Sequence, residues 1–235
     1  MAARLFGSFA CAALAVLAMP LALPAQQVQA APCPDVEVVF ARGTAEPPGL
    51  GITGTAFVES VRLQAGGRSV GSYAANWPAS ADFGNPLPFA RTVVDGARDV
   101  TSHVEFMAAN CPGTRIVLGG YSQGAVLVGI ATMAGVPDSV PPQYRPEFPP
   151  PLSATAASKV AAVVFYARPS ERFLRDAGSP PVVVGPAVAG RVLDHCIPFD
   201  NICGGSPLAQ PNPLHVLYAV NGMAYTGAGF AVSRL

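Results

Sequence analysis

Residues 116–128 read IVLGGYSQGAVLV and place a single serine among glycines inside an apolar run. The five residues 120–124, GYSQG, match the pattern G-x-S-x-G. We expect a buried strand directly before this turn, at 115–118, and a helix of small residues after it, at 125–133. A strand, a sharp turn at serine and a helix are typical of a nucleophile elbow.

The glycines around Ser122 have a physical reason under this interpretation. A sharp turn from strand to helix strains the backbone of its central residue and crowds the neighbours, which must then lack side chains. The Ser122 hydroxyl would stand clear of the turn, and the helix N-terminus would offer unpaired N–H groups to an anion. In a plain turn Ser122 would only cap the helix. The context favours the catalytic interpretation.

A serine hydroxyl is a poor nucleophile and needs a histidine base that a carboxylate orients. In this class of fold the serine comes first along the chain, then the acid, then the histidine. Two histidines follow Ser122. His195 has Asp194 and Glu171 upstream, but it abuts Cys196 at the end of an apolar run.

His215 is the better candidate base, because it lies at a junction of loop and helix where its ring is free to approach the sheet. Asp200 lies between Cys196 and Cys203, where a disulfide would stiffen the segment that carries the carboxylate. We therefore predict Asp200 and His215 as the pair. His103 precedes the serine on an amphipathic segment and is expected to be a solvated helix residue.

The oxygen of an attacked carbonyl needs at least two aimed donors. The backbone N–H of Gln123 is one donor by its position. Thr44 could supply its N–H and its hydroxyl from the loop after the first expected strand. From the residues alone, Thr44 is equally well explained as an ordinary turn residue.

The wider pattern alternates apolar strands with helices, which predicts an α/β fold with a mostly parallel sheet covered on both faces. Strands are expected at 36–41, 69–74, 115–118 and 160–166, and helices at 55–64, 89–109, 125–133 and 214–225. The proline-rich stretch 135–151 is expected to be a surface excursion. It is either a loop near a binding site or, as we favour, an ordinary insertion.

The first thirty residues have the features of a secretory signal peptide. Arg4 precedes an apolar stretch, and the residues 28–30, VQA, fit a small-x-small cleavage pattern. A retained membrane anchor is the alternative, although Pro20 and Pro24 interrupt the apolar run. We predict a signal peptide at 1–30 and a single domain at 31–235, without a transmembrane segment.

Charge and cysteine usage fit an exported protein. The chain has 14 basic and 14 acidic side chains, and loss of Arg4 would leave one acid in excess, which argues against nucleic acid as a partner. The four cysteines after residue 30 predict two disulfides over a metal site, because no Cys-x-x-Cys is present. Three pairings are possible. Cys196 and Cys203 are close enough to close a small loop, which leaves Cys33 with Cys111.

Several segments together resemble the cutinase family, and most closely its cutinase-like bacterial members. They are FARGTAE at 40–46, GGYSQGA at 119–125, the spacing Cys196-x3-Asp200-x2-Cys203, and His215. The resemblance runs in order across nearly the whole chain after residue 32. It implies a small α/β-hydrolase with the triad Ser122, Asp200 and His215, the oxyanion donors Thr44 and Gln123, and both disulfides.

The expected function is that of a secreted serine esterase, extracellular or associated with the cell envelope. It would cleave short- to medium-chain acyl esters, including lipids or cutin-like polyesters, through an acyl-enzyme on Ser122. We expect a monomer without cofactor or metal. A thioesterase or peptidase with the same triad, and a non-catalytic exported surface antigen, remain alternatives.

Overall fold

A computed structural model describes residues 32–235. These residues contain one five-stranded sheet with the strand order β2-β1-β3-β4-β5. Every neighbouring pair of strands is parallel. The strands are β1 (Val36–Ala41), β2 (Val70–Ala74), β3 (Arg115–Tyr121), β4 (Val160–Tyr166) and β5 (Val192–His195). The predicted parallel α/β architecture is confirmed, and β5 is a strand that the sequence reading missed.

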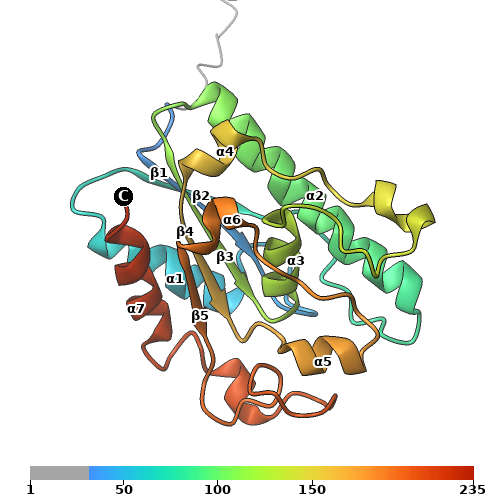
Figure 1. Ribbon diagram of the computed structural model, residues 1–235. Coiled ribbons are helices and arrows are strands. Elements are labelled where there is room, and N and C mark those ends of the chain that lie inside the picture. Colours follow the sequence, from blue (N-terminus) through green and yellow to red (C-terminus); the bar gives the residue numbers. More distant parts are fainter. Residues whose placement is uncertain (1–31) are drawn as a thin grey trace, which may run out of the picture. The chain divides into compact units, whose positions relative to one another are not determined.

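Helices cover both faces of the sheet (Figure 1). α1 (Gly51–Gln64) and α7 (Met223–Val232) pack on one face, and α2 (Pro86–Asn110), α3 (Gln123–Ala131), α4 (Ala154–Lys159) and α6 (Pro186–Ala189) on the other. The remaining helices are η1 (Pro142–Glu147), α5 (Glu171–Asp176) and η2 (Pro213–Val216). Alternate side chains of β1 enter the two cores: Val38 and Phe40 face α1, and Val39 faces α2.

The end of the chain differs from the prediction. One helix was expected at 214–225, but η2 ends at Val216 and α7 begins only at Met223. Gly222 separates them with a φ of 89°, a left-handed conformation that interrupts a right-handed helix. The apolar pattern did not reveal this break, because it continues across both short helices.

The prediction for His103 was wrong. Its ring stacks on Tyr73 with ring centroids 3.6 Å apart, and its Nε2 lies 3.3 Å from Oε1 of the buried Glu37. The sequence predicted that only apolar side chains of α2 face the sheet. His103 can also face it because Glu37 on β1 provides a hydrogen-bonding partner for its ring.

Both disulfides are present: Cys33 pairs with Cys111, and Cys196 with Cys203. The predicted signal peptide lies outside the described residues. Within residues 32–235, no helix is long and apolar enough to cross a membrane.

Candidate active site

Ser122 occupies the turn between β3, the central strand, and α3. Its φ of 54° and ψ of −119° are strained for a residue with a side chain. A Cβ on Gly120 would overlap the backbone of α3, and a Cβ on Gly124 would overlap the carbonyl oxygen of Ala41 at the end of β1. The glycines are therefore required because backbone, which cannot move aside, fills the space next to them.

The structure brings Ser122, His215 and Asp200 together from three separate segments. Nε2 of His215 lies 2.9 Å from Oγ of Ser122, and Nδ1 lies 2.9 Å from Oδ2 of Asp200. His215 is held in η2, and Asp200 follows β5 inside the loop that the Cys196–Cys203 disulfide closes. An imidazole thus connects a hydroxyl to a carboxylate, which is the arrangement that activates a serine nucleophile.

Asp200 is fully buried yet well supplied with donors. Besides His215, its carboxylate accepts a hydrogen bond of 2.7 Å from the Tyr218 hydroxyl and one of 2.9 Å from the backbone N–H of Ile202. Burial acts to raise the pKa of Asp200, but the hydrogen bonds from His215, Tyr218 and Ile202 outweigh it and keep this pKa below its ordinary value. Asp200 is therefore held as the anion that orients His215.

Two tyrosines that the sequence reading did not single out support this pair. The Tyr121 hydroxyl donates to the carbonyl oxygen of His215 at 2.7 Å and so fixes the backbone of η2. The Tyr218 hydroxyl accepts from the N–H of Ile197 at 2.9 Å while it donates to Asp200. Burial raises the pKa of both phenols, so both remain donors at neutral pH. Tyr218 lies three residues after His215, and this spacing was the available signal.

Thr44 contacts Gln123, the residue directly after Ser122. Oγ1 of Thr44 donates to Oε1 of Gln123 at 3.1 Å, which places the loop after β1 against the start of α3. The backbone N–H of Gln123 belongs to the first residue of α3, where helix geometry provides no acceptor within the helix. These groups can donate to an oxygen next to Ser122.

The alternative histidine is not part of this arrangement. His195 stacks on Tyr166, and its Nε2 lies 3.4 Å from Oγ1 of Thr226 on α7. Asp194 pairs with Arg168 instead, at 2.6 Å. Among the described residues, no group of three or more His, Cys, Asp or Glu side chains is arranged to hold a metal ion.

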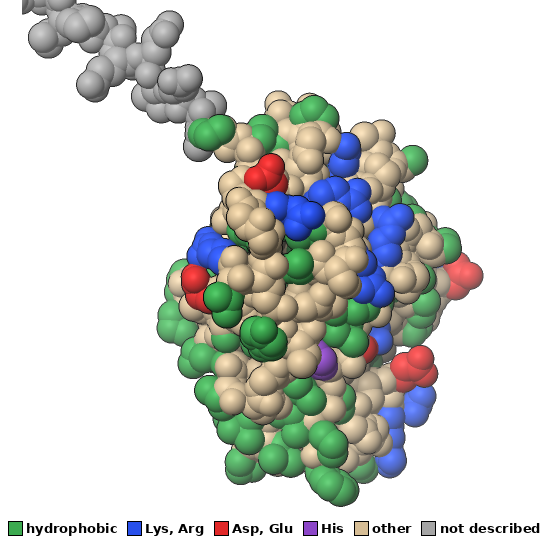
Figure 2. Space-filling view, turned by 90° about the vertical axis from the view of Figure 1, so that its left-hand side faces the viewer, with side chains coloured by type: hydrophobic (Ala, Val, Ile, Leu, Met, Phe, Trp, Pro, Cys, Tyr) green, Lys and Arg blue, Asp and Glu red, His purple; other side chains and the backbone are tan. Residues whose placement is uncertain are grey.

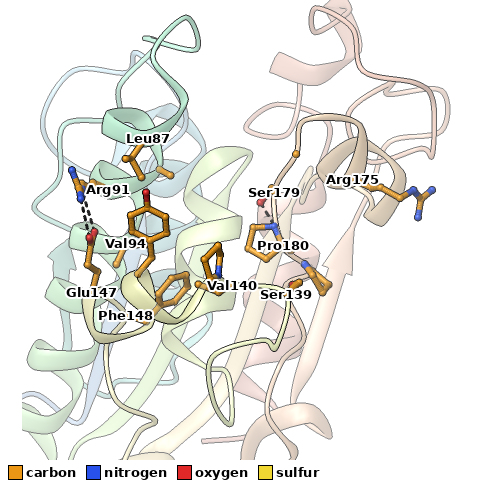
Figure 3. Close-up of a pocket in the computed structure, with 15 residues that line it drawn as sticks. Leu87, Arg91, Val94, Ser139, Val140, Glu147, Phe148, Arg175, Ser179 and Pro180 are labelled. Atoms are coloured by element: carbon orange, nitrogen blue, oxygen red, sulfur yellow. Dashed lines mark hydrogen bonds and ion pairs between the residues drawn. The ribbon is translucent and has the colours of Figure 1, made fainter.

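A separate cavity of about 400 Å³ lies between the first half of α2, residues 139–148 and residues 175–181 (Figure 3). Leu87, Val94 and Phe148 give it apolar walls, and the ion pair of Arg91 and Glu147 stands at its edge (Figure 3). Part of the proline-rich excursion thus lines a cavity. None of the triad residues or the two oxyanion candidates lines it, so the chemistry described above belongs elsewhere.

The surface near the triad is apolar and carries little charge. Phe199 and Val216, the neighbours of Asp200 and His215, are 87% and 66% exposed. From residue 196 to residue 233, Asp200 is the only Asp, Glu, Lys or Arg. This segment lies at the lower end of the molecule in Figure 1. In Figure 2 the lower left of the face shown has many hydrophobic side chains, and the basic side chains lie mostly higher up and along the right side.

The parallel sheet covered by helices on both faces defines an α/β-hydrolase fold, and the linked Ser122, His215 and Asp200 side chains form a candidate serine-type site on it. A sequence model of the family described as Cutinase matches residues 32–235. The chain belongs to the cutinase family and is a serine esterase, which hydrolyses carboxylic esters.

Individual relatives agree with this assignment. "Probable carboxylesterase Culp7" of Mycobacterium tuberculosis is 48% identical over 73% of this chain and 88% of its own length. "Carboxylesterase Culp1" of the same organism is 38% identical over 99% of this chain and 95% of its own length. A solved structure of Trichoderma reesei cutinase with a phosphonate inhibitor has a TM-score of 0.61 and 29% identity, covering 86% of this chain and 77% of its own.

Proposed function

We propose that this serine esterase works through an acyl-enzyme on Ser122, with His215 as the base and Asp200 as the residue that orients it. The observation that carries the proposal is the unbroken link from the Ser122 hydroxyl through His215 to Asp200, with 2.9 Å at each step. The strained backbone of Ser122 supports the proposal, because residues held in such conformations are concentrated at active sites.

In the first half of the reaction, Oγ of Ser122 attacks the ester carbonyl while its proton moves to Nε2 of His215. Thr44 and the N–H of Gln123 donate to the oxygen that becomes negative. The tetrahedral intermediate collapses, the carbon–oxygen bond to the alcohol breaks, and His215 returns the proton to the leaving oxygen. Asp200 stabilises the imidazolium that exists between these two transfers.

In the second half, water attacks the acyl-enzyme and gives its proton to His215. The bond between Oγ and the acyl carbon breaks, the carboxylic acid leaves, and Ser122 recovers its proton. We propose acyl esters of short to medium chain length as substrates. The exposed Phe199 and Val216 support this proposal, because apolar side chains beside the triad suit hydrocarbon chains.

The test is the hydrolysis of p-nitrophenyl butyrate by Ser122→Ala, with Ser102→Ala on the exposed surface of α2 as the matched control. Ser122→Ala should lose at least about 10³-fold in kcat, as removal of a triad nucleophile does. The control should behave like the parent. Equal rates for Ser122→Ala and the parent would refute the proposal.

A fluorophosphonate probe separates the enzyme from a non-catalytic surface antigen, because it should label Ser122 in the folded parent and leave Ser122→Ala unlabelled. Matched ester, thioester and amide substrates separate an esterase from a thioesterase or peptidase. We expect the ester to be hydrolysed fastest.

We also propose that residues 1–30 are a signal peptide and that residues 31–235 act as one exported domain. The two disulfides support export, because such bonds persist in oxidising compartments. Expression of the full chain with sequencing of the released protein tests both points, and a mature N-terminus at residue 31 is expected. Protein retained in the cytoplasm with its first residues intact would contradict the proposal.

A further inference from the structure

The loop that carries Thr44 is attached to the start of α1 through one carboxylate. Oε2 of Glu46 accepts the backbone N–H of Gly43 at 2.6 Å, and Oε1 accepts the backbone N–H of Ile52 at 2.8 Å. Ile52 is the second residue of α1, whose N-cap residue provides no side-chain hydrogen bond. Glu46 therefore serves α1 as a remote cap while it holds the residue directly before Thr44.

The residue directly after Thr44 is strained. Ala45 has a φ of 58°, in the left-handed region that a residue with a side chain avoids, and its N–H donates to the carbonyl oxygen of Ala79 at 2.8 Å. Nε of the buried Arg42 donates to the carbonyl oxygen of Glu46 at 2.8 Å. Such a conformation persists only when its surroundings enforce it. Glu46 is held through both its side chain and its backbone, so it is a central restraint of this loop.

The chemistry of these contacts requires a carboxylate. An ionised glutamate has two oxygens that only accept, and here each oxygen receives one N–H. A glutamine of the same shape offers one accepting oxygen, and its amide NH₂ would face the second N–H donor. Gly51 provides the room, because a Cβ at that position would overlap the Glu46 carboxylate.

We propose that Glu46 is a positioning residue of the oxyanion hole: it fixes Gly43 and so directs Thr44 toward the oxygen that becomes negative during attack by Ser122. This inference rests on the proposed function, in which Thr44 donates to that oxygen. Because the negative oxygen exists only after attack has begun, loosening the loop affects the transition state more than substrate binding.

The experiment compares Glu46→Gln with Glu59→Gln, an exposed position on α1 whose side chain pairs with Arg62. Removal of one oxyanion donor generally costs about 10²- to 10³-fold in kcat. A donor that is loosened but still present should cost less, so we expect Glu46→Gln to lose about 10- to 100-fold in kcat with little change in KM. Glu59→Gln should match the parent. Rates are divided by the amount of serine that a fluorophosphonate labels at completion, which corrects for unfolded protein.

A second measurement isolates the oxyanion hole. A trifluoromethyl ketone with a butyl chain adds to the catalytic serine and places a negative oxygen where the transition state has one. Its affinity should fall in Glu46→Gln by the same factor as kcat/KM, which a general loss of stability would not produce in normalised protein. Unchanged ketone affinity, a change in KM alone, or parental kcat in Glu46→Gln would overturn the inference.

The two proposals can fail separately. If Ser122→Ala is inactive while Glu46→Gln equals Glu59→Gln, the role of Glu46 is refuted and the esterase mechanism stands. If Ser122→Ala keeps parental activity, the proposed function and this inference both fail.

Discussion

Replacement of Tyr218 by phenylalanine removes one oxygen atom from beneath the candidate triad and leaves the ring in place. That hydroxyl contacts the loop that the Cys196–Cys203 disulfide closes: it donates to Asp200 at 2.7 Å, accepts from the N–H of Ile197 at 2.9 Å and lies 3.3 Å from Sγ of Cys203. Tyr218 is fully buried, so water cannot readily take over these contacts. The variant should therefore lose both stability and activity.

The expected size follows from the contacts with Asp200 and Ile197. A hydrogen bond to a charged group contributes about 1.5–3 kcal/mol, and a buried N–H left without a partner costs about 1–3 kcal/mol. Because phenylalanine has no hydroxyl that must be removed from water on folding, part of this loss is offset, and we expect the free energy of unfolding to fall by about 2–5 kcal/mol. Asp200 keeps its bonds to His215 and Ile202, so the loss in kcat should be limited to about 10-fold.

The assays are urea denaturation followed by circular dichroism, and hydrolysis of p-nitrophenyl butyrate by the folded fraction. Tyr225→Phe, which removes the hydroxyl of a tyrosine that is 54% exposed on α7, is the control. Parental stability together with parental kcat would refute this reasoning.

Three further results are expected. Gly124→Ala should destabilise the fold by at least about 1–3 kcal/mol and remove most activity, because its Cβ would overlap the Ala41 carbonyl oxygen; a calorimetric Tm equal to that of the parent would contradict this. The ionised Asp200, whose folded-state pKa is lowered, stabilises the fold above its unfolded pKa of about 3.9, and this stabilisation disappears as pH falls through the folded value. The difference in unfolding free energy between the parent and Tyr218→Phe should therefore narrow below about pH 4, and a constant difference down to pH 2 would argue against it. The double variant Cys196→Ser/Cys203→Ser should lose about 10-fold in kcat, because the loop that presents Asp200 is no longer closed by a disulfide. Its circular dichroism spectrum should be unchanged. Full activity of this variant would show that the loop keeps its shape without the disulfide.

Local patterns predicted much of this architecture. The bounds of β1 and β4 follow from short apolar runs that end at turn residues, and the elbow follows from glycines that flank a serine. These features depend on neighbours along the chain, which the sequence displays directly. β5 was missed because it has only four residues, two of them polar, so no periodicity could identify it.

The supports of the candidate site were harder to predict, because they are contacts between distant segments. Tyr121 reaches the backbone of His215 across 94 positions, and Thr44 reaches Gln123 across 79. Glu46 lies near its partners in sequence, but its role depends on the strained turn at Ala45, which no composition signal marks. The prediction that His103 is solvated was wrong for a related reason, because its partner Glu37 is on a strand 66 positions away.

Because the Cys196–Cys203 disulfide closes the loop that carries Asp200, the position of the Asp200 carboxylate depends on whether the surroundings are oxidising or reducing. In a reducing environment Asp200 would lie on an open segment without this covalent brace, and its hydrogen bond to His215 would be less firmly held. Oxidation of the two thiols would then complete the candidate site, so the proposed activity would be full only where disulfides persist.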